Sequence, residues 1–502
     1  MNAVLKSLPK ALAAEVRQIE VKPGRLGQMV DAGEVALAST GLVFNRGGVL
    51  VRLDPASGGT VPLASSVCRV DLARAARWVR QVRSEDGGWK LVQEDPPRPV
   101  SAALVEMGHW QHIPKLRAVV DHPLWLAPGR AHEGGYDLKS GIYCTAPQPA
   151  WRARADATQE EAEESLCALR DAIKTFPWAA PCDEAAALAS MLCSLSRPVL
   201  EVAPLLLITA PTPGSGKGLL GQAIAQFAQA SPAAGATLSA DDEEVRKDLF
   251  SRLLQSRQVI FFDEIAGVAG ASLDSPALRT LATSPIFSSR ILGSTRESEV
   301  STSTLVIISA NNATPGADSA RRMIEIRLDP RCESPAGRRF TGPEPAAFIN
   351  SHRQEMIRAA MTIQAAYIHA GLPGLADLPP VSNYSDWNFW ARGPIAWLLG
   401  IDPAQRLVEA QRVDSRAGEI AETLAAIHSR MSSTRWKAAE LLQHQDTTTA
   451  MREALGLPPN REPGSRQVGR WLMGARDRMA GGFVLREASR AGGSVTWQIS
   501  RT

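Results

Sequence analysis

No apolar run in this sequence approaches the roughly 18 residues that a membrane-spanning helix needs. The opening stretch "MNAVLKSLPKALAAEVRQIE" contains acidic residues and lacks the continuous apolar core of a signal peptide. The 6 cysteines form no Cys-x-x-Cys pair, and the 8 histidines do not cluster with cysteines or carboxylates. These absences argue against a membrane span, a disulfide framework and a zinc site, and they favour a cytoplasmic protein with buried thiols.

Neither sign of charge dominates the chain, whose formal net charge is +3, but the basic residues are unevenly placed. Between Arg435 and Thr502 there are 11 Lys and Arg residues against 6 Asp and Glu residues. Such a basic region indicates an anionic partner, with nucleic acid as the first candidate, or else a solvated basic surface. Composition by itself leaves both interpretations open.

Several domains are expected from 502 residues, since one domain usually takes about 100–200. Residues 1–145 predict a small mixed α/β domain with a hairpin at "NRGG", and they contain no motif of recognisable chemistry. Residues 146–199 predict a linker and then helices, the first capped by Thr158 and Glu161. Residues 200–330 predict an α/β core, 331–430 a helical region, and 431–502 helices followed by a β-hairpin.

Three short apolar runs mark the central part of the chain: "LLLIT", "VIFF" and "LVIIS". They lack polar alternation, which is typical of strands buried on both faces of a parallel sheet. Helical patterns separate them, as in "KGLLGQAIAQFAQA", where apolar residues recur at i, i+4 and i+7. This β-α-β succession predicts an open parallel sheet, which binds its ligands at the carboxyl ends of the strands.

The first of these strands is followed by "APTPGSGKGLL", a variant of the phosphate-binding loop. A phosphate cradle needs inward-pointing backbone N–H groups, glycines that allow close approach, and a helix N-terminus behind them. Lys217 would reach the β- and γ-phosphates of a nucleotide. The residues expected to surround ATP are Pro213, Gly214, Ser215, Gly216, Lys217, Gly218 and Leu219.

Acidic and amide residues end the two later strands. Asp263 would hold Mg²⁺, directly or through water, and Glu264 would polarise the attacking water. Asn311 would position that water or contact the γ-phosphate. The intervals from Lys217 to Asp263 and from Asp263 to Asn311 each leave room for a helix, a strand and a second helix. The order of these motifs predicts a P-loop core that binds ATP and Mg²⁺.

The chain resembles the helicase half of primase-helicases from phages, plasmids and integrative elements, which lie near the superfamily three helicases of the AAA+ (ASCE) class. Five segments carry the resemblance: "TAPTPGSGKGLL", "VIFFDEIAG", "RILGSTRESEV", "VIISANNATPGADSARRMIEIRLD" and "SDWNFWARGPIAWLLGIDP". It covers residues 100–403 and is strongest over 205–330. The resemblance implies an AAA+ core and a ring, expected to be a hexamer, that hydrolyses ATP at subunit interfaces and translocates on DNA.

The resemblance also implies roles for individual residues. By position, Lys217 corresponds to the Walker A lysine, Asp263 and Glu264 to the Walker B pair, and Asn311 to the sensor asparagine. Either Arg321 or Arg322 corresponds to the arginine finger that serves a neighbouring subunit, although a surface ion pair would explain both. Arg290 and Arg296 fall where such helicases carry a DNA-binding hairpin, although they would also suit an exposed loop.

Three features depart from the family pattern. Gly218 stands where a Ser or Thr hydroxyl usually holds Mg²⁺, although nucleotide kinases that resemble adenylate kinase also carry Gly-Lys-Gly. Pro211 replaces the first glycine of the loop, but it precedes the amides that bind phosphate. Relatives often carry an N-terminal primase, whereas this chain has no zinc-ribbon cysteines, so any primase is expected to be a separate protein.

Residues 431–502 predict a winged helix-turn-helix, because helices precede two alternating strands around Ala491-Gly492-Gly493. Its recognition helix would be "SRQVGRWLMGARDRM", which offers cations to phosphates or base edges. The candidate DNA-binding residues there are Arg466, Arg470, Arg476 and Arg478. Winged helices also bind proteins, so that alternative stays open. The aromatic residues of "SNYSDWNFWARGPIAW" predict a hydrophobic core rather than a base-stacking surface.

The leading hypothesis is an ATP-dependent DNA helicase or translocase of a mobile genetic element, acting in replication on single-stranded or forked DNA. One alternative is a replication initiator that binds ATP and DNA without sustained unwinding, which Gly218 favours and the intact Asp263-Glu264 pair disfavours. A second alternative, a small-molecule kinase, is suggested by Gly-Lys-Gly. The Asp-Glu pair, Asn311 and the basic C-terminal region argue against it.

Overall fold

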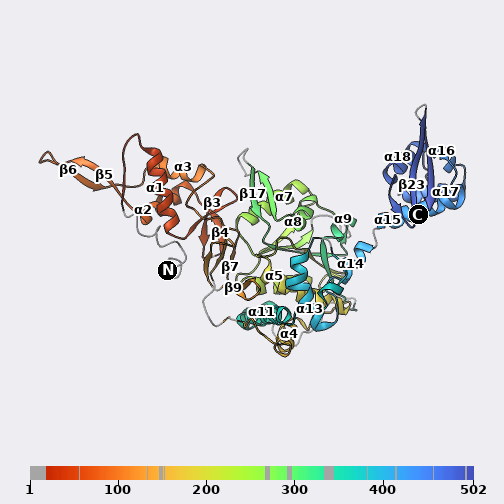
Figure 1. The fold of residues 1–502 in the computed structure, drawn as a ribbon, viewed down its shortest axis with the longest axis horizontal. Coiled ribbons are helices and arrows are strands. Elements are labelled where there is room, and N and C mark those ends of the chain that lie inside the picture. The colour runs from red at the N-terminus through yellow and green to blue at the C-terminus, as the bar shows by residue number, and fades with distance from the viewer. Residues whose placement is uncertain are drawn as a thin grey trace. The chain divides into compact units, whose positions relative to one another are not determined.

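The computed structural model describes residues 18–55, 57–132, 134–145, 151, 153–265, 272–290, 297–332, 344–381, 383–412, 415–455, 457–458, 460–491 and 494–501. The chain forms two compact units, Met1–Val408 and Glu409–Thr502, each described by itself below (Figure 1). None of the six cysteines forms a disulfide. Across the described ranges, no helix combines the length and apolarity needed to cross a bilayer.

The first part of unit 1 mixes short helices and strands. The helices are α1 (Leu26–Ser39), α2 (Ser65–Ala75) and α3 (Arg98–Glu106). The strands are β1 (Gln18–Glu20), β2 (Val43–Arg46), β3 (Val49–Asp54), β4 (Gly59–Pro62), β5 (Arg77–Arg83), β6 (Trp89–Gln93), β7 (Ala118–Val120), β8 (Leu124–Ala127), β9 (Arg130–His132), β10 (Gly135–Asp137) and β11 (Ile142–Cys144). The predicted hairpin is confirmed, since β2 pairs antiparallel with β3 across the Gly47-Gly48 turn.

Two helices lead into the central sheet: α4 (Gln159–Ile173) and α5 (Pro181–Ser196). The predicted capping box is present at the start of α4. The Thr158 side chain accepts a hydrogen bond from the Glu161 backbone N–H, and the Glu161 carboxylate accepts one from the Thr158 N–H. Both partners satisfy N–H groups that a helix start would otherwise leave unpaired. Helix α5 is buried along nearly its whole length and packs against the core.

The centre of unit 1 is a five-stranded sheet in which every pairing is parallel, as predicted. Its strands are β12 (Leu205–Ala210), β13 (Gly235–Leu238), β14 (Val259–Ile265), β18 (Leu305–Asn311) and β20 (Met323–Arg327), in the order β13-β14-β18-β12-β20. Helices α6 (Lys217–Ala228) and α7 (Asp242–Leu254) connect the first three strands in chain order. The mixed α/β class and the parallel sheet agree with a P-loop core.

The segment between Asp263 and Asn311 is long enough for a helix, a strand and a second helix, and its described residues use that length differently. They form the helix α8 (Pro276–Thr283) and an antiparallel hairpin of β16 (Ile286–Arg290) with β17 (Glu297–Ser301), in the region where the family resemblance implied a hairpin. Residues of β17 alternate between exposed and buried, which suits a strand that covers a core with one face only. The short strands β15 (Ser272–Leu273) and β19 (Thr314–Pro315) also pair with each other.

The rest of unit 1 is mostly helical. The elements are α9 (Ala317–Ala320), α10 (Pro345–Ser351), α11 (Arg353–His369), η3 (Leu375–Asp377), α12 (Ser385–Trp387), η4 (Asn388–Arg392), α13 (Gly393–Leu399) and α14 (Gln405–Arg412), the last of which crosses into unit 2. Tyr384, Trp387 and Trp390 are buried in the largest hydrophobic cluster, and Trp397 packs against it. The aromatic residues therefore belong to the core, as predicted, and are not free to stack on bases.

Two sets of contacts fix the early strands to the central sheet. Arg46 is buried, and its Nε donates to the carbonyl of Leu253 at 2.7 Å, at the end of α7. Burial lowers the pKa of Arg46 to about 9. The Thr60 N–H donates to the carbonyl of Gln255 at 2.8 Å. These bonds attach β2 and β4 directly to the helix that precedes β14.

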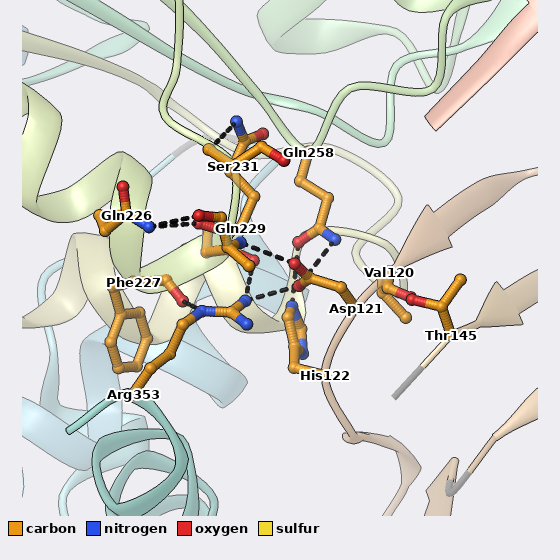
Figure 2. A network of polar contacts seen from close by, with 12 residues as sticks. Val120, Asp121, His122, Thr145, Gln226, Phe227, Gln229, Ser231, Gln258 and Arg353 are labelled. Atoms are coloured by element: carbon orange, nitrogen blue, oxygen red, sulfur yellow. Dashed lines mark hydrogen bonds and ion pairs between the residues drawn. The ribbon is translucent and has the colours of Figure 1, made fainter. Parts of the chain in front are cut away.

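A polar network at the end of α6 makes a second attachment (Figure 2). Arg353, on α11, donates to the carbonyls of Phe227 and Ala228 at 3.2 and 2.9 Å, and it pairs with Asp121 at 2.5 Å. The neighbouring His122 is fully buried, which lowers its imidazole pKa to about 4, although Asp121 opposes the shift. The guanidinium thereby satisfies carbonyl groups that the end of α6 leaves without helical partners.

Unit 2 has a hydrophobic core of its own, formed around Leu424, Trp436 and Trp497. Its elements after α14 are α15 (Ser415–Met431), β21 (Trp436–Lys437), α16 (Ala438–Leu441), α17 (Gln445–Ala454), α18 (Ser465–Ala475), β22 (Met479–Ala480), β23 (Phe483–Ala491) and β24 (Ser494–Arg501). The predicted terminal hairpin is present, because β23 pairs antiparallel with β24, and Gly492 and Gly493 lie outside the described residues. Unit 2 begins before the predicted boundary at 431, since α15 contributes to its core.

Candidate nucleotide-binding site

The loop between β12 and α6 has the backbone shape of a phosphate cradle. Gly214 and Gly216 adopt φ angles of +74° and +94°, a left-handed conformation that is unfavourable for residues with a side chain. Gly216 is the N-cap of α6, so the N–H groups of the first helical turn open toward the loop. Ser215 is buried and its hydroxyl donates to the Thr212 carbonyl, which fixes the loop from inside. Pro213 and Leu219 are exposed at the two ends of the cradle.

Lys217 places its ammonium at the sheet edge where two strands end. Its Nζ donates to Asn311 Oδ1 at 2.6 Å and lies 3.4 Å from the Thr212 carbonyl. The residue is only 8% exposed, and burial lowers the pKa of its ammonium, while the negative charge of Asp263 opposes that shift. The structure therefore brings together the lysine and the asparagine that the sequence placed 94 residues apart.

Asp263 lies directly against Gly218. A Cβ atom on residue 218 would stand 2.8 Å from Asp263 Oδ1, which is closer than such atoms approach. The Ser309 hydroxyl donates to the same oxygen at 2.7 Å. The pairing of β14 with β13 skips Asp263, and such a bulge re-aims a side chain beside a site. Asp263 and Glu264 are thus residues within β14, not residues that follow it.

The donor atoms around Asp263 fit a magnesium ion bound with a nucleotide. Mg²⁺ usually takes one or two carboxylates and completes its octahedron with water and substrate phosphates. Asp263 is exposed, and its Oδ2 has no recorded hydrogen bond in the described part of the chain, so this oxygen is open. Gly218 offers no hydroxyl here, and the Asp263 carboxylate stands in the space that a side chain at 218 would fill. In the ranges described, no three His, Cys, Asp or Glu side chains gather as a metal cluster.

Two contacts at this site were not predicted from the sequence. Ser309, a polar residue inside an apolar strand, holds the Asp263 carboxylate. Asn312 adopts a φ of +49° and its Nδ2 donates to the Pro211 carbonyl at 3.0 Å, so it ties the start of the loop to β18. A lone serine in "LVIIS" and a second asparagine in "ANN" were the available signals. Glu264 is exposed beside Asp263.

The two candidate arginine-finger residues are held within their own chain. Arg321 pairs with the Asp318 carboxylate, three residues earlier, and Arg322 donates to the Asp318 carbonyl. Arg321 is exposed and Arg322 half-buried. No contact of either arginine with the 211–218 loop is recorded among the described residues. The isolated chain therefore shows the ion-pair alternative, and a role toward a neighbouring subunit stays a prediction.

The candidate DNA-binding residues fall on two surfaces. Arg290 is exposed at the end of β16, opposite Glu297 in the hairpin, and Arg296 lies outside the described residues. In unit 2, Arg466 and Arg470 are exposed on α18 and line a groove of about 710 Å³ together with Lys437. Arg476 instead pairs with Glu487 at 2.8 Å, and Arg478 is exposed after the helix.

Comparison with protein-family models and with curated proteins gave no match. Among solved structures, the apo A form of the NrS-1 C-terminal region is 11% identical, with a TM-score of 0.35, over 86% of this chain and 98% of that chain. The active helicase Cch of SCCmec type IV is 12% identical, with a TM-score of 0.34, over 92% of this chain and 97% of that chain. Because both scores are below 0.5, the functional argument rests on the geometry of the site alone.

Proposed function

We propose that the chain is an ATP-dependent DNA helicase or translocase of the AAA+ class, similar to superfamily three helicases, that serves the replication of a mobile genetic element. One observation carries the proposal. The cradle lysine meets Asn311 of β18 at 2.6 Å, while the cradle glycine, Gly218, lies against Asp263 of β14. Three strand ends that are remote in sequence thus converge on one loop with the charges that ATP hydrolysis needs.

Each residue of this site has a role that follows from its position. The backbone N–H groups of Gly214 to Gly218 face the β-phosphate, and Lys217 gives up its bond to Asn311 to contact the γ-phosphate. Asp263, oriented by Ser309, would hold Mg²⁺, which neutralises phosphate charge when bound. Glu264 accepts a proton from the attacking water, and the freed amide of Asn311 orients that water.

A ring of subunits, taken to be a hexamer, would complete this site. Arg321 or Arg322 would have to exchange Asp318 for the γ-phosphate bound by a neighbouring subunit. Both pairs lie at or near the surface, where an ion pair contributes only about 0–1 kcal/mol, so this exchange is energetically modest. The β16–β17 hairpin and a winged helix in unit 2 would contact single-stranded or forked DNA, and a separate primase would act with the motor.

A replication initiator that binds ATP and DNA without sustained unwinding is the second candidate. Gly218 is the observation that favours it, because the loop offers no hydroxyl to Mg²⁺. In that case ATP would stabilise an assembly on DNA and turn over slowly. The same site supports both functions, and only the rate of hydrolysis and its response to DNA separate them.

ATP turnover with and without single-stranded DNA tests the proposal. The wild type should hydrolyse ATP faster with DNA, while Lys217→Ala should lose ATP binding and Glu264→Gln should bind ATP but turn over about 10²–10⁴-fold more slowly. Lys247→Ala, at an exposed lysine of α7, is the matched control and should resemble the wild type. ATP binding without turnover in the wild type would reject the motor in favour of the initiator.

A further inference from the structure

A β-ribbon projects from the first part of unit 1 (Figure 1). Strands β5 and β6 pair antiparallel. Val79 lies opposite Gln93 at the base, and Arg83 lies opposite Trp89 at the tip. Within the described residues, the contacts that hold the ribbon are at its base. There β1 pairs with Arg77–Val79, and the buried Trp78 donates through Nε1 to the Leu72 carbonyl at 3.0 Å. The ribbon is therefore anchored at one end and open to solvent on both faces beyond Val79.

The ribbon exposes large apolar side chains that a solvated hairpin has no structural need for. All five residues of β6 are exposed, and Trp89 is 69% exposed at the tip. Residues directly opposite in an antiparallel pair share a face, so Trp89 lies beside Arg83, and Leu91 follows on the same face. An aromatic ring, an aliphatic side chain and a guanidinium thus form one continuous surface.

The two strands are also entirely one-sided in charge. They carry Arg77, Arg80, Arg83 and Lys90 and no acidic residue between Arg77 and Arg83 or between Trp89 and Gln93. Arg80 pairs with Glu94 at the base at 3.0 Å. For Arg83 and Lys90 no ion pair is recorded in the described residues. Because Arg83 and Lys90 lie on opposite faces, the strands present cations on both sides next to the turn, whose exposed Glu85 and Asp86 are the acidic residues at the tip.

A groove of about 610 Å³ lies where the chain leaves β6 at the base of the ribbon, since Asp95 and Pro96 belong to its lining. It lies between α2 and α3 and is lined by Arg69, Arg74 and Arg98, with Asp95 as the acidic residue of the lining. Asp95 pairs with Arg69 at 3.3 Å, which leaves two exposed arginines on the rim, Arg74 and Arg98. The groove thus adds a second basic surface, formed in part by residues that directly follow β6 in the chain.

We propose that the β5–β6 ribbon and the arginine-lined groove beside it bind single-stranded DNA. Trp89 stacks on an unpaired base, Arg83 and Lys90 contact the flanking phosphates, and Arg74 and Arg98 receive the continuing backbone. Exposed aromatic residues among cations are the common means of binding single strands without sequence preference. In a duplex the bases are already stacked on each other, so a tryptophan at the tip of the ribbon gains nothing from them.

A strand of another protein is the competing occupant, because β6 has an unpaired edge. Backbone pairing along that edge would give no role to cations on both faces. It would also leave Trp89, whose ring points from a face and not from the edge, exposed as before. A polyanion with flat rings satisfies the cations and the tryptophan together, so the charge and the aromatic surface both favour nucleic acid.

This inference goes beyond the proposed function, which places DNA at the β16–β17 hairpin and unit 2, and it rests on that function only for the choice of DNA over RNA. It gives the first part of the chain a role that does not involve the nucleotide site. ATP turnover in the absence of DNA is therefore independent of it, and the two proposals can fail separately.

The test measures the affinity of the full chain for a fluorescent oligo(dT) strand without nucleotide, by anisotropy over a range of salt concentrations. Trp89→Ala should weaken binding about 5- to 150-fold, the range known for loss of one stacked base, and Trp89→Phe should restore most of the affinity. Arg83→Gln combined with Lys90→Gln should lower the slope of log affinity against log salt by about 1.4.

Arg358→Gln, at an exposed arginine of α11, and Leu138→Ala, at an exposed leucine, are the matched controls and should bind like the wild type. ATP turnover without DNA should be equal in all variants, which shows that they are folded. Unchanged oligo(dT) affinity in both ribbon variants would overturn the proposal. Equal weakening for a duplex of the same length would overturn the base-stacking role, and a changed oligomeric state with unchanged DNA affinity would assign the ribbon to self-association.

Discussion

Gly218 is the residue at which the candidate site departs most from the familiar loop, and its neighbour Asp263 explains why. In the usual loop a hydroxyl at this position shares the metal with an acidic residue. Here Asp263 Oδ1 occupies the space that a side chain at 218 would need. Ser309 holds that oxygen from the other side at 2.7 Å. The Asp263 carboxylate therefore occupies the position that a side-chain hydroxyl at residue 218 would take, and only glycine fits beside it.

Replacing Gly218 by serine should lower ATP turnover instead of raising it. The new Cβ would meet Asp263 Oδ1 at 2.8 Å and displace it from the Ser309 hydroxyl. Forcing an extra group into a packed position typically costs about 1–3 kcal/mol, which corresponds to roughly 5- to 150-fold in rate if it falls on the transition state. Steady-state turnover at saturating ATP, over a range of Mg²⁺ concentrations, measures this effect.

Gly218→Ala is the control for that experiment, because it adds the Cβ without a hydroxyl. Both variants should lose activity, and the losses in the serine and alanine variants should be equal to within a small factor. A serine variant more active than the wild type would show that the hydroxyl is needed and that Asp263 moves aside easily.

At the scale of single elements, helix α6 links the nucleotide loop to the first part of the chain. Its N-terminus is the cradle at Gly216, and its C-terminal carbonyls, Phe227 and Ala228, accept from Arg353 of α11 (Figure 2). Arg353 also pairs with Asp121, between β7 and β8. One guanidinium thus joins three segments, and it lies near the negative end of the α6 dipole, where a cation is favourable.

Replacing Arg353 by methionine should destabilise unit 1 strongly. The substitution leaves the Asp121 carboxylate without its cation and two α6 carbonyls without their donor. Removing one partner of a buried pair typically costs about 3–5 kcal/mol, which urea unfolding of the full chain would report as a lower midpoint for the transition of unit 1. Arg353→Lys should lose less, because it keeps the charge but cannot donate to all three acceptors.

Arg358→Met serves as the comparison, since Arg358 is exposed on the same helix. It should leave the transition within about 0.5 kcal/mol of the wild type. Equal behaviour of the two methionine variants would mean that Arg353 is not a structural link.

The elements with regular periodicity were predictable, whereas the contacts between them were not. The apolar runs "LLLIT", "VIFF" and "LVIIS" became β12, β14 and β18 because strands buried on both faces tolerate no polar alternation. The sequence could not reveal that Ser309 faces Asp263, because one polar residue in an apolar strand carries no partner information. Chain length between Asp263 and Asn311 only left room for a helix, a strand and a second helix, whereas the family resemblance placed a hairpin at "RILGSTRESEV", the region in which β16 and β17 pair.

At the scale of the whole molecule, the two units each have their own hydrophobic core. Helix α15 belongs to the second core, because Leu424 and Ile427 are fully buried with Trp436 and Trp497. A truncation at Arg435 would therefore expose the apolar face of α15 and confuse loss of DNA binding with misfolding. Substitutions on the surface of α18 in the full chain avoid this problem.

Replacing Arg466 and Arg470 together by glutamine should weaken binding to duplex or forked DNA and lower its salt dependence. Both side chains line the basic groove beside α18, and each phosphate contact removed should reduce the slope of log affinity against log salt by about 0.9.

The single variant Arg476→Gln removes the same charge as either single arginine variant, but its guanidinium is already paired with Glu487 at 2.8 Å. It should therefore change the slope less than Arg466→Gln does. If the double variant binds DNA as tightly as the wild type at every salt concentration, this face of unit 2 contacts a protein instead of DNA.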